Sequence, residues 1–205
     1  MIGPDGRGER QLTRTGVNES DPAWSPDGKQ IAFAVLERPT YDYSLYVMHA
    51  DGLGRRRLAG TPDDETAPTW SPDGRLIAYT RWVKGEQFQV WVMDADGSAQ
   101  RPLLPAPSGR AVWSPDGKRL AYASSGGGDP AIWVAKADGS GRRQLTRNRA
   151  QDFPPTWSPD GRRIAFTSNR RGGFDLYVMN ADGSGQRRLA GLPGNDGEPA
   201  WQPAR

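Results

Sequence analysis

The sequence predicts an all-β protein, a β-propeller built of four-stranded antiparallel blades. First, Gly and Pro number 26 and 18, which leaves little room for helices. Second, short apolar runs bounded by Gly, Pro and Asp recur along the chain, as expected of strands. Third, one tryptophan motif returns at intervals of 46, 43, 44 and 44 residues, a period typical of propellers and solenoids. Its members are Trp24, Trp70, Trp113, Trp157 and Trp201.

The first predicted strand of each repeat ends in a tight turn. It is a short Pro-x-Trp-Ser run followed by Pro-Asp-Gly, in which proline presets φ and glycine supplies a positive φ. We expect each tryptophan to lie near the propeller axis and to pack against the next blade. We also expect the turn aspartates to bind nearby amides, a structural role shared by the turn serines; they are Asp27, Asp73, Asp116 and Asp160, with Ser25, Ser71, Ser114 and Ser158.

The second and third predicted strands are apolar at nearly every position, as in "IAFAV" (31–35) and "LYVM" (45–48). Such runs indicate strands that are covered on both faces. An Asp-Gly pair then predicts a hairpin to the fourth strand. That strand is rich in arginine, which predicts an exposed edge where solvated charge blocks pairing with another sheet.

The chain is predicted to be one domain, residues 1–205, with repeats at about 20–60, 64–105, 108–147 and 151–191. Residues 4–13 match the end of a third strand, a hairpin and a fourth strand, and residues 197–203 match a first strand. This predicts four complete blades plus a partial closing blade from both termini. The chain could be a piece of a longer protein, a compact ring with a degenerate fifth blade, or a half-ring completed by another copy. Because bare apolar blade faces need cover, self-association or an unusual closure is favoured over an open arc.

Composition excludes several classes of function. The chain has no cysteine, which excludes disulfides, zinc–thiolate sites and thiol catalysis. The net charge of +3 comes without a basic stripe interleaved with aromatics, so we expect no nucleic-acid binding. No apolar run approaches the length of about 20 residues that a membrane span needs, and "MIGPDGRGER" lacks the apolar core of a signal peptide.

No catalytic set is predicted. The single histidine, His49, occupies a position where other repeats have Asp94, Lys136 or Asn180, which indicates an exposed polar slot. The chain has no Gly-x-Ser-x-Gly nucleophile motif. A pair of glycosidase carboxylates is compatible with the spacings, but nothing selects one pair among the turn aspartates. We therefore predict no enzymatic activity and no cofactor.

Carboxylates lie five residues before four of the five tryptophans. A ring of them at one mouth of the channel would attract a cation or a basic peptide, which makes this a candidate ligand site with an undetermined metal. The favoured alternative is that each carboxylate caps its own blade through backbone hydrogen bonds. The candidate residues are Glu19, Glu65, Asp152 and Asp196, with Ser108 at the remaining position.

The segment between the second and third strands differs from repeat to repeat. Loops on a rigid scaffold often carry function, and exposed aromatics are typical anchors of protein interfaces. Four aromatics exceed what the repeat requires and are candidate interface residues, unless they pack on their neighbours: Tyr41, Tyr43, Trp82 and Phe88.

These motifs resemble the TolB-like β-propeller family. The matching stretches are "WSPDGKQIAF", "WSPDGRLIAY", "WSPDGKRLAY", "WSPDGRRIAF" and "LYVMNADGSGQRRLA", and the resemblance covers nearly the whole chain. It implies a rigid, non-enzymatic scaffold that binds protein or peptide, with a location in the periplasm or cell envelope. The family also includes peptidase-gating and carbohydrate-active propellers and usually has six or more blades. A carbohydrate-binding or carbohydrate-active propeller, or a truncated or artificial fragment that self-assembles, are therefore the alternatives.

Overall fold

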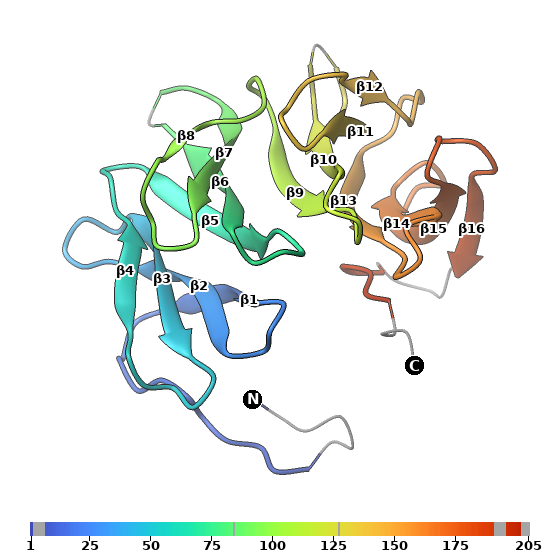
Figure 1. Ribbon diagram of the computed structural model, residues 1–205. Helices are drawn as coiled ribbons and strands as arrows, with labels where there is room; N and C mark the ends of the chain where they lie inside the picture. The colour runs from blue at the N-terminus through green and yellow to red at the C-terminus, as the bar shows by residue number, and fades with distance from the viewer. Residues whose placement is uncertain (2–6, 84, 127, 191–195, 202–205) are drawn as a thin grey trace.

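The computed structural model describes residues 1, 7–83, 85–126, 128–190 and 196–201. Over these residues every regular element is a β-strand, and the strands form four separate four-stranded sheets. The sheets follow one another around a central hollow as an open arc (Figure 1). The predicted fold class, four complete antiparallel blades, is confirmed.

Each blade is a meander in which every strand pairs with the next strand along the chain. Blade 1 contains β1 (Glu19–Trp24), β2 (Gln30–Leu36), β3 (Tyr43–His49) and β4 (Arg56–Ala59). Blade 2 contains β5 (Asp64–Trp70), β6 (Leu76–Trp82), β7 (Phe88–Asp94) and β8 (Arg101–Pro102). Blade 3 contains β9 (Gly109–Trp113), β10 (Arg119–Ser124), β11 (Ala131–Lys136) and β12 (Arg143–Gln144). Blade 4 contains β13 (Asp152–Trp157), β14 (Arg163–Ser168), β15 (Asp175–Asn180) and β16 (Arg187–Ala190).

The Ser-Pro-Asp-Gly turn is held by one repeated set of hydrogen bonds. In blade 1 the Ser25 hydroxyl donates to Asp27 Oδ1 (2.6 Å) and accepts from the Gln30 amide (2.9 Å). The same carboxylate accepts from the amide of Lys29 (3.1 Å), and Gly28 closes the turn with a φ of 67°. The serine hydroxyl holds the pKa of the Asp27 carboxyl below its ordinary value. Blades 2, 3 and 4 repeat these serine–aspartate bonds.

Apolar side chains of neighbouring blades form the core. Trp70 clusters with Leu45, Val47 and Leu58 of blade 1, and its indole Nε1 donates to the Ala23 carbonyl (3.2 Å). The expectation that each tryptophan packs against the next blade is wrong, because these rings pack against the preceding one. Among the described residues no sheet precedes that of Trp24, which is 48% exposed, whereas Trp70, Trp113 and Trp157 are 6–8% exposed.

The arginines of the fourth strands are exposed, as predicted for an outer edge, and two of them also bond to the next blade. Arg56 Nη1 donates to the Asp96 carbonyl (2.9 Å) in the hairpin of the next blade. Arg143 Nη1 does the same with the Asp182 carbonyl (2.8 Å). Two of the four fourth strands, β4 and β12, are thereby fixed to the blade that follows them.

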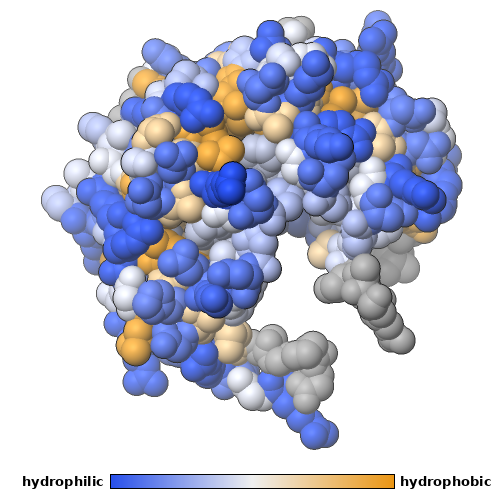
Figure 2. Space-filling view, viewed as in Figure 1, coloured by the Kyte–Doolittle hydropathy of each residue, from blue (hydrophilic) through white to orange (hydrophobic). Residues whose placement is uncertain are grey.

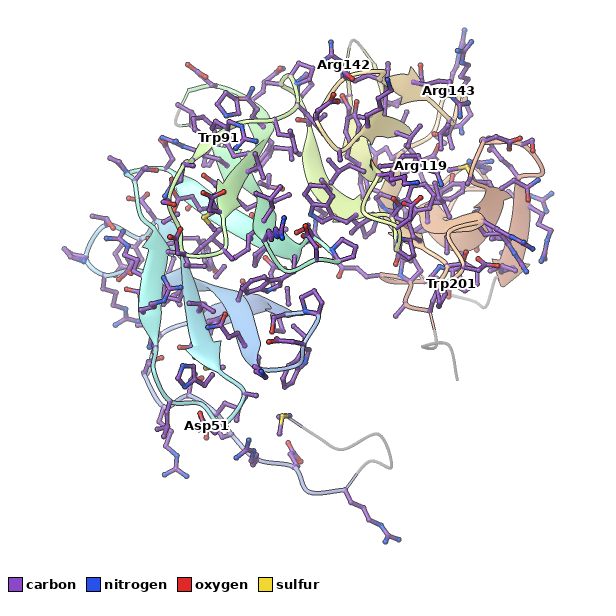
Figure 3. The ribbon with its side chains drawn as sticks, viewed as in Figure 1. Asp51, Trp91, Arg119, Arg142, Arg143 and Trp201 are labelled. Carbon is purple, nitrogen blue, oxygen red and sulfur yellow. The ribbon has the colours of Figure 1, made fainter. Side chains whose placement is uncertain are left out.

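The two terminal segments make the same kinds of contact as complete blades do, an arginine contact at one end of the arc and a tryptophan contact at the other. Arg10 Nη2 donates to the Ala50 carbonyl (2.9 Å), as a fourth-strand arginine does. At the other end, Trp201 Nε1 donates to the Thr156 carbonyl (3.2 Å), as a first-strand tryptophan does. Figure 3 shows Trp201 at one end of the arc and Asp51 at the other. The terminal segments thus match parts of a further blade but leave the arc open, so the described residues do not form the compact ring named among the alternatives.

The first strand of each blade carries a bulge three residues before its tryptophan. Asp21, Ala67 and Arg110 have φ of 50–51° there, and the strand register shifts at the same place. A positive φ is uncommon outside glycine, and bulges re-aim side chains. Together with Pro154 and Glu198 of the remaining repeats, these residues line a central channel of about 460 Å³.

Hydrophilic residues dominate the face shown in Figure 2, and the hollow of the arc opens through it. The residues described by the structure include no helix of the length and hydropathy needed to cross a membrane.

Candidate functional site

A cavity lined by aromatic side chains lies at one end of the blades. We call the end with the Ser-Pro-Asp-Gly turns the turn end, and the opposite end, with the loops between second and third strands, the loop end. At the loop end a cavity of about 410 Å³ spans blades 2, 3 and 4. Phe88 and Phe153 line it together with Thr80, Ser108 and Arg110. We call this cavity the mouth pocket.

Phe88 is held in place by the first residues of β7. It lies opposite Trp82 in the ladder between β6 and β7, and the centroids of the two rings are 5.9 Å apart. The Trp82 indole is fixed by a bond to the Glu86 carbonyl (3.1 Å), and the Phe88 carbonyl accepts from the Ser108 amide (2.8 Å). Phe88 is nevertheless 53% exposed, so a preorganised aromatic surface extends from the pocket outward.

Phe153 brings an aromatic ring of blade 4 to the same pocket. It lies on β13 and stacks on Phe174 with ring centroids 5.8 Å apart, and the Thr167 hydroxyl donates to its carbonyl. Phe153 and Phe174 are half-buried, and together they line a second, smaller cavity of about 240 Å³ next to the C-terminal segment.

Arg110 lies where three cavities meet: the mouth pocket, the smaller cavity and the central channel. Its backbone amide donates to Thr80 Oγ1 (2.9 Å), which fixes the bulge on which it lies. Its guanidinium forms an ion pair with the carboxylate of Glu198, from the C-terminal segment. The Arg110 side chain remains 48% exposed, so it presents a cation beside aromatic walls.

Three hydroxyl groups around the mouth pocket, those of Ser108, Thr80 and Ser124, are hydrogen-bonded to backbone groups. Ser108 Oγ accepts from the Val90 amide (3.0 Å), and Thr80 Oγ1 accepts from Arg110 as described. The Ser124 hydroxyl donates to the Pro107 carbonyl. No histidine lines the pocket. The pocket therefore offers apolar and cationic contacts and no serine paired with a base.

The carboxylates predicted to ring the channel each have local partners of their own. Glu65 is fully buried and accepts from the Thr61 hydroxyl (2.9 Å) and amide (3.3 Å). Burial raises the pKa of the Glu65 carboxyl above its ordinary value of 4.5. Asp152 is also fully buried and accepts from Asn148 (2.8 Å) and Arg170 (3.2 Å).

The other two predicted carboxylates are anchored in the same manner. Glu19 accepts from the hydroxyls of Thr13 and Thr15 and lies 3.4 Å from Arg55 Nη1. Asp196 Oδ2 accepts from the Leu176 amide (3.3 Å) of β15. Glu65 and Asp196 accept from backbone amides, whereas the printed partners of Glu19 and Asp152 are side chains, so backbone capping of each blade also stays a prediction. Over the described residues, no three histidine, cysteine, aspartate or glutamate side chains gather to hold a metal. Ligand binding at these four carboxylates stays a prediction.

The four predicted interface aromatics separate into two pairs. Phe88 lines the mouth pocket and Trp82 stacks on it, as described above. Tyr41 is 65% exposed on the loop between β2 and β3 of blade 1, and Tyr43 begins β3, where its amide donates to Asp64 (2.8 Å). Neither tyrosine lines the mouth pocket.

His49 lies at the turn end, next to a wide depression of about 730 Å³ in blade 1. That depression is formed by exposed turn residues, including Asp27 and Lys29, whose side chains are 57% and 81% exposed. It is an open surface of the repeated turn, so we do not assign it a ligand.

Sequence reasoning did not single out Arg110, Phe153 or Phe174. Arg110 occupies the bulge position where the other repeats have Asp21, Ala67, Pro154 and Glu198. This change of residue type, at a repeat position close to the axis, is the sequence feature that could have identified Arg110.

Comparison with known proteins agrees with this architecture. The family model described as the TolB beta propeller domain matches residues 5–104 and 80–205. No curated protein sequence matches the chain. Among solved structures, TolB from Acinetobacter baumannii superposes with a TM-score of 0.80 at 23% identity over 92% of this chain and 47% of that protein. The chain thus spans about half the length of that TolB.

Two further structures show how widely the fold is used. A puromycin hydrolase superposes with a TM-score of 0.72 at 21% identity over 92% of this chain and 34% of that enzyme. A chain of a nidogen–laminin complex gives a TM-score of 0.66 at 17% identity, over 83% of this chain and 64% of that one. At these identities the similarity shows the fold alone.

Proposed function

Because the chain belongs to the TolB beta propeller domain family, we propose that it is a non-enzymatic, rigid platform that binds a protein or peptide segment in the mouth pocket. The observation that carries the proposal is that two aromatic residues, Phe88 and Phe153, line one cavity of about 410 Å³ together with Arg110. Ligand pockets typically measure about 300–1,000 Å³ and are mainly apolar with a few polar groups. Aromatic and arginine side chains are also the residues that dominate binding energy at protein interfaces.

Rigidity supports a binding role. Phe88 begins β7, which pairs with β6 along its length, and Phe153 lies on β13, where it pairs with Thr167 of β14. A site that is already ordered loses little conformational entropy when a ligand arrives, which favours affinity. The proposal is therefore a preformed site for one or two side chains of an extended segment.

The groups around the pocket favour binding over catalysis. The hydroxyls of Ser108, Thr80 and Ser124 are engaged with backbone groups, and His49 lies at the turn end. A nucleophile needs a base within hydrogen-bond reach, and the lining residues offer no such pair.

The proposal can be tested with a phage-displayed library of random short peptides. Peptides selected on the immobilised chain are synthesised, and their affinities for variants are measured by fluorescence polarisation. Phe88→Ala and Phe153→Ala are each expected to weaken binding by about tenfold or more. The matched control is Leu53→Ala, which removes an apolar side chain that is 67% exposed at the hairpin between β3 and β4, and should leave binding unchanged. Failure to select any peptide, or equal binding by all variants, would contradict the proposed function.

A further inference from the structure

We propose that the segment bound in the mouth pocket is acidic: the carboxylate of an internal Asp or Glu side chain binds Arg110, and an adjacent apolar side chain enters the pocket. This inference rests on the proposed function and gives the chemical class of its ligand. It also assigns Glu198, on the chain's own C-terminal segment, the role of a resident competitor for Arg110.

The contact between Arg110 and Glu198 is the first step of the argument. A side-chain carboxylate already occupies the guanidinium, and it comes from a residue in the interior of a peptide segment, residues 196–201. Arginine binds carboxylates through charge-assisted hydrogen bonds in a fork-shaped geometry. The structure thus contains an example of the recognition that we propose for the ligand.

The second step is that this ion pair is open to exchange. The side chains of Arg110 and Glu198 are 48% and 66% exposed. An exposed ion pair contributes only about 0–1 kcal/mol, since water and salt screen it. A ligand carboxylate that also brings an apolar neighbour into the pocket would therefore displace Glu198.

The third step is the charge around the axis. Arg110 is the one cationic residue among the five bulge-position residues lining the channel, which also include Asp21, Ala67, Pro154 and Glu198. The Asp21 carboxylate accepts from the Ala67 amide (3.3 Å) and lies two blades away from Arg110. The net charge of the chain, +3, further favours approach of an acidic segment.

The fourth step is that the residue for the ionic contact and the residues for the apolar contact line one cavity. Arg110, Phe88 and Phe153 line the same cavity, so a carboxylate on Arg110 leaves the neighbouring side chain beside the aromatic walls. Asp21 and Ala67 share the left-handed backbone of Arg110, so the bulge itself belongs to the fold. What distinguishes Arg110 is its side chain, placed where three cavities meet.

The experiment uses the peptides selected from the phage library above. We expect them to share an Asp or Glu next to an apolar residue. Changing that residue to Asn or Gln should weaken binding to the unmodified chain by about tenfold, and adding salt should weaken it further. The same change should have little effect on binding to Arg110→Gln. Glu198→Gln removes the competitor and should tighten binding of the acidic peptide by up to about fivefold.

The outcomes separate the two proposals. Selected peptides that depend on Phe88 but bind equally well with Asp or Asn would overturn the acidic ligand and leave the proposed function standing. Unchanged or weaker binding to Glu198→Gln would overturn the competitor role. If Arg110→Gln binds acidic peptides as tightly as the unmodified chain, the carboxylate site is wrong, and thermal unfolding of this variant checks that it remains folded. If no peptide is selected at all, the proposed function fails.

Discussion

At the turn end the four blades repeat one arrangement of atoms, whereas at the loop end equivalent positions carry different side chains. The hydroxyl of each turn serine donates to an aspartate at 2.5–2.6 Å in every blade. At the loop end, the bulge position carries Asp21, Ala67, Arg110 or Pro154 in the four complete blades, and only blade 2 has the Trp82–Phe88 pair.

This difference separates the residues that are common to all four blades from those that differ between blades. The serine–aspartate bond stabilises the first hairpin in each of the four blades. The strands at the loop end are held by backbone pairing, and their terminal side chains differ between blades. We therefore place the scaffold's stability in the repeated residues and its binding in the residues that depart from the repeat.

The largest expected effect compares two tryptophans at the same repeat position. Trp157→Ala should lower the free energy of unfolding by about 3–5 kcal/mol, because the ring is buried against blade 3. Trp24→Ala should cost about 1–2 kcal/mol, since its ring is 48% exposed. Urea denaturation followed by circular dichroism measures both. Equal losses would mean that another surface covers Trp24 in solution.

The next expected effect on stability concerns the buried carboxyl of Glu65 at the loop end. Burial raises the pKa of the Glu65 carboxyl in the folded state, so its ionisation weakens the fold as pH rises above its ordinary value of 4.5. Glu65→Gln should therefore gain stability relative to the unmodified chain as pH rises above 4.5, because an ionised group no longer needs to be buried.

The pH dependence provides the control for that variant. The gain from Glu65→Gln should shrink as pH falls toward and below 4.5, since the glutamate is protonated in both states only below that value. Thermal unfolding measured from pH 4 to 8 tests it. A variant that loses stability relative to the unmodified chain as pH rises over that range would show that the charged form of Glu65 supports the fold.

Removing one turn serine tests the turn end directly. Ser114→Ala loses the bond to Asp116 (2.5 Å) and the bond from the Arg119 amide (3.0 Å). We expect a loss of about 1–2 kcal/mol in the free energy of unfolding. Ser125→Ala, which changes a loop-end serine, should remain within about 0.5 kcal/mol of the unmodified chain. Similar losses for both serines would remove the distinction between the two ends.

The smallest expected effect on stability is that of Phe88→Ala. The ring is 53% exposed, so its removal should change the free energy of unfolding by about 0.5 kcal/mol or less. Differential scanning calorimetry measures this change. A loss of several kcal/mol would identify Phe88 as part of the core and not of a binding surface.

The repeat made the fold predictable, but it did not indicate which side chains form the mouth pocket. The spacing of the tryptophans and the apolar second and third strands predict the blades, which the four sheets confirm. Which neighbour a tryptophan contacts depends on the direction in which blades follow one another, and this is not written in one repeat; the prediction for Trp70 was therefore wrong.

The site required knowledge of which side chains converge. Arg110, Phe153 and Phe88 come from three different blades, and only the curvature of the arc brings them to one cavity. Glu65 and Asp152 resembled a charged ring in the sequence, but their burial and local hydrogen bonds became visible only in three dimensions.

The central claim is that binding and stability belong to opposite ends of the blades, and a paired measurement on two variants tests it most directly. Affinity for one selected peptide and the midpoint of urea unfolding are measured for Phe88→Ala and Ser114→Ala. The account predicts that Phe88→Ala loses affinity by about tenfold or more and keeps its midpoint, whereas Ser114→Ala keeps its affinity and unfolds at lower urea. Loss of affinity in Ser114→Ala together with unchanged affinity in Phe88→Ala would contradict it.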